Sequence, residues 1–166
     1  MAWCAGKGAT GFDWALVQAA GKGQIEAMAW CAGKGATDFD RAMAWAAGAG
    51  HIEAMAWCAG KGTIEFNWAM IEAAESGQIE AMAWCATEGR LTSGDRSFTR
   101  AIAEAVRSGE YEAAELALAW GGDINDALLD HCDDRWVAAV RAGEITVEPQ
   151  DPLEAYQPLG PFKFYD

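Results

Sequence analysis

The chain repeats itself with a period of 27 residues, and this repeat constrains its fold more than any other feature. The segment Ala29–Gly35, with the sequence AWCAGKG, recurs at Ala56–Gly62, opens the chain at Ala2–Gly8 and returns in altered form at Ala83–Gly89. A phenylalanine and a glycine recur with the same 27-residue spacing, and five residues are inserted before the fourth copy. They are Phe12, Phe39, Phe66 and Phe98, and Gly23, Gly50, Gly77 and Gly109. Such self-similarity is typical of stacked repeats, in which each unit packs only on its neighbours.

Each unit predicts two short helices. After Phe39, apolar side chains follow at i+4, i+7 and i+8, which is the spacing of one helix face. Glycines then end the first helix, and Gly-Lys-Gly ends the second. We therefore expect an all-α fold, a helix-turn-helix repeat solenoid with little or no β-structure. The expected helices are 12–20 and 24–32, 39–48 and 51–59, 66–75 and 78–87, and 97–107 and 110–120, with a fifth copy of the first helix at Cys132–Val140.

Three segments differ in character. Residues 1–90 hold the regular repeats, with ten acidic and six basic side chains. Residues 91–145 hold divergent, more acidic repeats and a predicted C-terminal cap. Residues 146–166 contain all four prolines and several aromatic residues, which predicts an extended tail. This tail either covers the last helices or binds a partner.

Composition narrows the classes of function. The formal net charge of −13 predicts a soluble protein that nucleic acid and anionic membranes repel, and whose protein partner has a basic surface. The N-terminus lacks the pattern of a secretory signal, and no apolar run reaches the ~18 residues of a membrane span. We therefore expect a cytoplasmic protein without direct nucleic-acid or membrane binding.

The sequence offers little for catalysis or metal binding. Four cysteines recur once per unit rather than in the short pairs of a zinc site, which predicts buried, reduced thiols. His51 takes a turn position that holds Gln or Glu in other units. His131, Cys132 and Asp133 are consecutive, so they point in different directions on a helix. The Gly-Lys-Gly segments lack the spacing of a P-loop. We expect no catalytic residue, no cofactor and no metal, and hence no enzyme.

The segment from Ala46-Ala47 through Gly50-His51-Ile52-Glu53 resembles the ankyrin repeat family. The resemblance covers roughly residues 2–120 and, more weakly, 123–145. Its period is 27 rather than 33, and the Thr-Pro-Leu-His motif that begins the family's first helix is missing. The six absent residues match the family's β-hairpin. The chain is similar to the short ankyrin-like repeats common in large DNA viruses. The resemblance implies a protein-binding module without catalysis. We therefore expect a protein that docks on a partner, and our hypothesis is that docking inhibits the partner.

One repeat position varies in a way that suggests partner binding. The second residue after the repeated Phe alternates between tryptophan and arginine, as Trp14, Arg41, Trp68 and Arg100. A position that accepts both types is expected to be exposed. Trp and Arg are also the residues that most often anchor protein interfaces. We therefore predict a partner-binding role for these four residues, against the alternative of chance variation.

A second candidate surface is an acidic stripe between the fourth and fifth units. If residues 123–136 form one helix, five carboxylates share one side of it, spaced about as closely as the phosphates of a DNA strand. They are Asp123, Asp126, Asp130, Asp133 and Asp134. Two interpretations remain open: a solvated terminal cap, or a nucleic-acid mimic that inhibits a nucleic-acid-binding defence enzyme of the CRISPR or restriction type.

The N-terminal end of the repeat array is a third candidate surface. Met1–Cys4 reads as the end of a second helix with no first helix before it. Solenoid ends need a polar cap, yet this end presents apolar residues around Phe12 and Leu16. We therefore expect homodimerisation through the N-terminal end.

Overall fold

A computed structural model describes residues 10–91, 95–123, 134–145, 148–149 and 152. Within these residues the secondary structure is helical, and no strand occurs. The helices are α1 (Thr10–Ala20), α2 (Ile25–Gly33), α3 (Phe39–Gly48), α4 (Ile52–Ala59), α5 (Phe66–Glu75), α6 (Ile79–Glu88), α7 (Arg96–Ser108), α8 (Tyr111–Ala119) and α10 (Asp134–Arg141). The predicted all-α class is confirmed, and the expected bounds of the first eight helices agree with the observed ones to within two residues.

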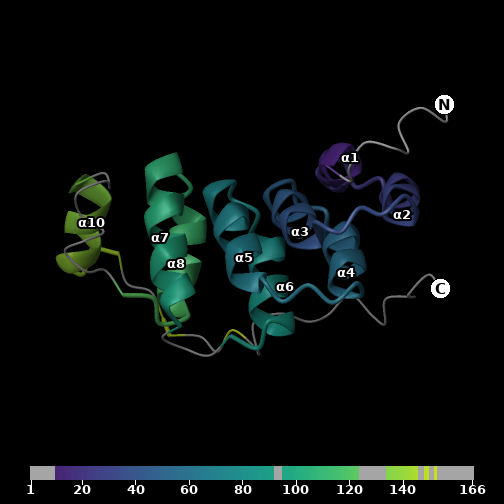
Figure 1. The fold of residues 1–166 in the computed structure, drawn as a ribbon. Coiled ribbons are helices and arrows are strands. Elements are labelled where there is room, and N and C mark those ends of the chain that lie inside the picture. Colours follow the sequence, from purple (N-terminus) through teal and green to yellow (C-terminus); the bar gives the residue numbers. More distant parts are fainter. Residues whose placement is uncertain (1–9, 92–94, 124–133, 146–147, 150–151, 153–166) are drawn as a thin grey trace.

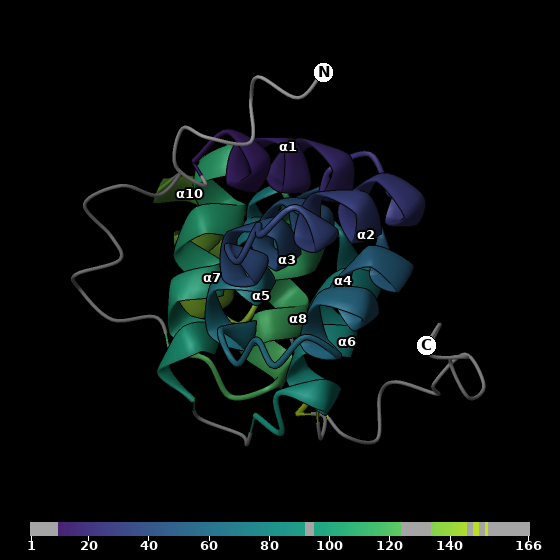
Figure 2. The ribbon, with the colours of Figure 1, turned by 45° about the vertical axis from the view of Figure 1, so that its right-hand side comes forward.

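The helices pack in the order of the chain. The odd-numbered helices α1, α3, α5 and α7 contact one another in sequence, and each packs against the even-numbered helix that follows it (Figure 1). The even-numbered helices α2, α4, α6 and α8 contact one another in a second row (Figure 2). The helix α10 lies beyond α7 and α8. A side chain at a given repeat position therefore lies beside its equivalents on the neighbouring helix pairs.

The core follows the repeat. One row of buried side chains comes from the first helices and another from the second helices, and both recur at the repeat spacing. They are Leu16, Met43, Met70 and Ile102, and Met28, Met55 and Met82. Small alanines between them, such as Ala46 and Ala47, are fully buried, which allows neighbouring helices to approach closely. Each helix is too short to be stable alone in water, so this shared core is what holds it.

The turns between paired helices stack on one another. Gly23, Gly50 and Gly77 have positive φ angles of 64°, 73° and 66°, which glycine adopts without strain. A Cβ atom built on Gly23 would lie 3.0 Å from the His51 imidazole, and one on Gly50 would lie 2.5 Å from the Gln78 side chain. The residue before each second helix thus covers the glycine of the preceding turn. His51 has a packing role here, as its Gln and Glu counterparts do.

The third unit departs from the pattern at its end, where the insertion begins. The helix α6 continues to Glu88, and the left-handed residue is no longer the repeated glycine but Arg90, with φ of 50°. The next unit begins early, because Asp95 caps α7 by accepting a hydrogen bond from the Ser97 backbone N–H at 2.9 Å. Residues 92–94, which belong to the insertion, lie outside the described residues.

Candidate functional site: a tryptophan–arginine face

The repeat position that alternates between tryptophan and arginine lies on the surface of the odd-numbered helices. Trp14 on α1 is 50% exposed and Trp68 on α5 is 38% exposed. Arg41 on α3 and Arg100 on α7 are also exposed. The four residues occupy the first or second turn of helices that pack side by side. Their expected exposure is confirmed, and their part in binding stays a prediction.

A third exposed indole joins this position. Trp45, one turn after Arg41 on α3, is 38% exposed and meets Trp14 edge to face, with ring centroids 5.6 Å apart. The Arg41 guanidinium lies over the Trp14 ring at 5.5 Å from its centroid. We call Trp14, Arg41, Trp45, Trp68 and Arg100 the tryptophan–arginine face.

These contacts hold the side chains of the face in place. An edge-to-face aromatic pair contributes about 0.5–1.5 kcal/mol, and an exposed cation–π contact about 0.5–1 kcal/mol. At the far end, the Trp68 indole N–H donates a hydrogen bond of 3.0 Å to a Glu72 carboxylate oxygen. The rings are therefore exposed but oriented before any partner arrives, which lowers the entropy cost of binding.

The backbone beneath the face is fixed by contacts between units. Asp13, one residue before Trp14, accepts hydrogen bonds from the backbone N–H groups of Thr37 at 2.7 Å and Asp38 at 3.2 Å. Asp40, the equivalent residue of α3, accepts a hydrogen bond from the Thr63 hydroxyl group. The helices α1 and α3 thus each carry a carboxylate that holds the loop leading to the next unit.

The acidic stripe is described only at its ends. Asp123 is exposed, lies outside any helix and donates its backbone N–H to the Thr99 hydroxyl at 3.0 Å. Asp134 begins α10. Asp123 itself is therefore not helical, and its backbone N–H ties it to α7. Asp126, Asp130 and Asp133 lie outside the described residues.

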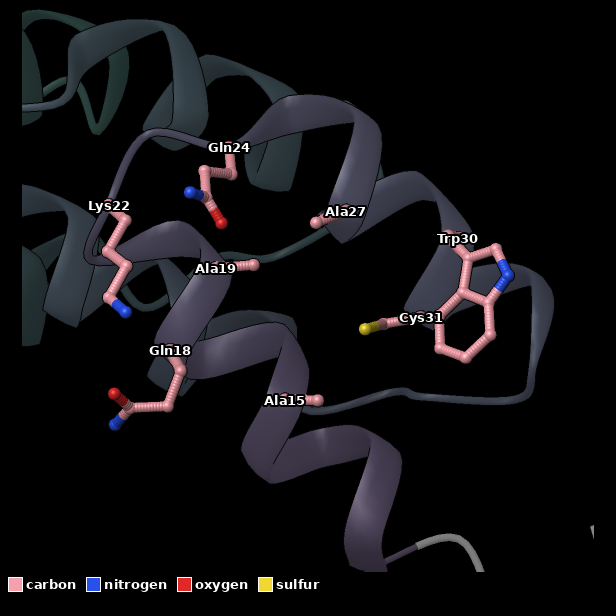
Figure 3. Close-up of a pocket in the computed structure, with 8 residues that line it drawn as sticks. All are labelled: Ala15, Gln18, Ala19, Lys22, Gln24, Ala27, Trp30 and Cys31. Atoms are coloured by element: carbon pink, nitrogen blue, oxygen red, sulfur yellow. The ribbon is translucent and has the colours of Figure 1, made fainter. Parts of the chain in front are cut away.

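Another surface feature is a groove at the N-terminal end of the described array, between α1 and α2 (Figure 3). It measures about 450 Å³ and is lined by three alanines, two glutamines, Lys22, Trp30 and Cys31. Trp30 is 57% exposed, although its equivalents Trp57 and Trp84 are half-buried and buried. The three tryptophans occupy one repeat position, and the repeat alone predicts the same packing for all of them. The segment Met1–Cys4, which suggested this end as an interface, lies outside the described residues.

The described cysteines do not have the character of nucleophiles. Cys31, Cys58 and Cys85 are buried and unoxidised, as expected, whereas Cys4 and Cys132 lie outside the described residues. Burial, together with a smaller effect of the nearby Asp40 carboxylate, raises the pKa of the Cys58 thiol to about 12. Burial also raises the pKa values of Cys31 and Cys85. Because the thiolate is the reactive form, these thiols are poorly suited to covalent chemistry at neutral pH.

The raised pKa of Cys58 predicts a loss of stability at alkaline pH. The unfolded chain releases this proton near pH 9.0 and the folded chain near pH 12, so stability falls as the pH rises through that window. The Cys58 contribution should fall by about 2 kcal/mol between pH 9 and 10.5. Urea unfolding of wild type and Cys58→Ala at both pH values measures the difference, since the other titrating groups are shared. A difference that does not change with pH would contradict the prediction.

Comparison with known protein families, with curated proteins and with solved structures finds no match to this chain. Within the described part of the chain, no helix is both long and apolar enough to cross a membrane. The same residues bring together no group of three or more His, Cys, Asp or Glu side chains that would hold a metal ion. The tryptophan–arginine face and the groove between α1 and α2 are the two candidate binding surfaces of the described residues.

Proposed function

We propose that this chain is a repeat solenoid, similar to ankyrin repeats without their β-hairpin, that binds another protein and catalyses no reaction. The observation that carries this proposal is the tryptophan–arginine face, in which three indoles and two guanidinium groups lie exposed on four adjacent helices. Docking on the partner is proposed to inhibit it. The reduced cysteines agree with action in the cytoplasm.

The face has the composition of an interface core rather than of an ordinary surface. Soluble proteins expose single large apolar side chains, but contiguous exposed aromatic residues mark interaction sites. The rings of Trp14 and Trp45 contact each other, and the Arg41 guanidinium lies over the Trp14 ring, so these three residues form one contiguous patch. Trp and Arg are enriched among the residues that dominate binding energy. The overall charge of −13 favours a partner whose surrounding surface is basic.

The nucleic-acid mimic remains the alternative, and it differs in which residues carry the affinity. A mimic would rely on the stripe, of which the described residues include only Asp123 and Asp134. The salt dependence separates the two proposals, because screening weakens contacts between exposed charges much more than contacts between buried indoles. Competition by duplex DNA is a second criterion, since only a mimic shares its binding site with nucleic acid.

The test begins with affinity capture of a partner from the native host and then measures its affinity for purified variants. The double variant Trp14→Ala/Trp68→Ala should bind at least about tenfold more weakly, because anchor residues carry most of the binding energy of an interface. Ile64→Ala is the matched control, since Ile64 is 80% exposed but lies outside the face. Duplex DNA should not compete. Equal affinity of wild type and the double variant, or competition by DNA, would overturn the proposal.

A further inference from the structure

The groove between α1 and α2 is the surface that each later unit presents to the unit before it. Two contacts establish which side this is: Trp45 lies against Gly21, and His51 lies against Gly23, so this side of α3 and α4 faces α1 and α2. We call this side of a helix pair its leading face. One repeat earlier, Trp45 and His51 correspond to Gln18 and Gln24, which both line the groove (Figure 3). The groove is therefore the leading face of the first described unit.

In later units the same face is closed. The alanines and the cysteine that line the groove have equivalents that are at most 1% exposed in the second and third units. These equivalents are Ala42, Ala46, Ala54 and Cys58, and Ala69, Ala73, Ala81 and Cys85. In the first unit Ala15 and Ala27 are only half-buried, and Trp30 is 57% exposed. No other described segment covers this groove. The surface thus has the composition of an interface between helix pairs, but the described part of the chain leaves it open.

Charge favours a second copy of this chain as the occupant. The acidic side chains of residues 10–35 are Asp13 and Glu26 and the basic ones are Lys22 and Lys34, so this unit has no net charge. The whole chain carries −13, so two copies repel each other least at this end. Lys22 and Trp30 lie at opposite ends of the groove (Figure 3).

We propose that two copies associate head to head across a two-fold axis through this groove. Such an axis places Trp30 of each copy near Lys22 of the other, so both cation–π pairs form at once, as an isologous interface requires. The chain already uses this pairing internally: the Lys34 ammonium lies 5.6 Å from the Trp30 ring centroid, and the Lys61 ammonium lies 5.0 Å from that of Trp57. The Trp30 indoles fill the space that a preceding helix pair would occupy. This interface leaves the tryptophan–arginine face free for its partner.

Charge substitution at the centre of the groove tests this proposal. Wild type should sediment as a dimer at high micromolar concentration in analytical ultracentrifugation. Ala27→Glu and Ala27→Lys should each weaken dimerisation by at least about 100-fold, because each places two like charges in a buried contact. An equimolar mixture of the two variants should form a heterodimer, since the charges then pair. Circular dichroism checks that each variant remains helical.

Ala29→Glu is the matched control, because Ala29 lies on the same helix but is exposed and does not line the groove. This control should dimerise as wild type does. A wild-type monomer at high micromolar concentration overturns the proposal, whatever else covers the groove. So does a dimer that Ala27→Glu and Ala29→Glu weaken equally, or a mixture of the two Ala27 variants that stays monomeric.

Discussion

Replacing Trp120 by alanine should lower the free energy of unfolding by about 3–5 kcal/mol, the range for truncating a large aromatic residue in a protein core. Trp120 follows α8, is 0% exposed and packs on Phe98 with ring centroids 5.5 Å apart. Three earlier units make the corresponding contact with a tryptophan inside the second helix, as in the pair of Phe66 and Trp84. The fourth unit has Leu116 at that position, so Trp120, one turn later, supplies the ring.

Chemical denaturation followed by circular dichroism measures this effect, and two variants serve as controls. Trp120→Phe should cost less than Trp120→Ala, because a ring remains and because the buried Nε1 has no hydrogen-bond partner among the described residues. Trp30→Ala should cost only about 1–2.5 kcal/mol, since Trp30 is 57% exposed and the variant loses one aromatic and one cation–π contact. Equal losses for Trp120→Ala and Trp30→Ala would contradict the packing described above.

The helices were predictable because two independent signals agree at each boundary. Apolar residues at i, i+4 and i+7 mark the buried face, and glycine marks the end of each first helix. The same signals recur four times, so an error in one unit is corrected by the others. The largest difference is at the start of α1, which begins at Thr10 rather than 12. The helix α7 begins at Arg96 rather than 97, because Asp95 caps it.

The repeat could not predict how the exposure of equivalent side chains differs from one unit to the next. Trp30, Trp57 and Trp84 have the same sequence context, yet their exposure falls from 57% to 2% along the array. The exposure of a side chain depends on which neighbouring unit packs against it, and a repeat pattern does not contain this information. The contact of His51 with Gly23 was not predicted for a similar reason, because it joins residues that lie 28 positions apart on different units.

The candidate site was predictable in part. The alternation of tryptophan with arginine at one position indicated exposure, because a buried position would not accept a guanidinium without a partner. Trp45 was missed because its equivalents Gln18, Glu72 and Glu104 are polar, so nothing in the repeat linked it to Trp14. Its contribution follows only from the packing of α1 against α3, which brings the two rings within 5.6 Å.

Gly122→Ala should lower the free energy of unfolding by about 3 kcal/mol, the upper part of the range for overpacking a core. Gly122 follows the left-handed Gly121, and its N–H donates to the Ala117 carbonyl at 3.1 Å. The equivalent residues Ala36 and Leu91 have buried side chains, so glycine at 122 is not a requirement of the turn itself. The requirement comes from the neighbouring helix, which leaves no room for a methyl group.

The crowding at Gly122 involves atoms that cannot move independently. A Cβ atom there would lie 2.6 Å from Ile102 Cδ1, 2.9 Å from the Ala117 carbonyl oxygen and 3.1 Å from the Phe98 carbonyl carbon. Ile102 Cδ1 can turn away, but the other two atoms belong to the backbones of α7 and α8. The same substitution at Gly33 meets nothing within 4 Å and lies within α2, so Gly33→Ala should stabilise the chain by about 0.4–1 kcal/mol. Thermal unfolding should therefore shift in opposite directions for the two variants. If both variants shift the same way, the close packing of α8 on α7 at this turn is wrong.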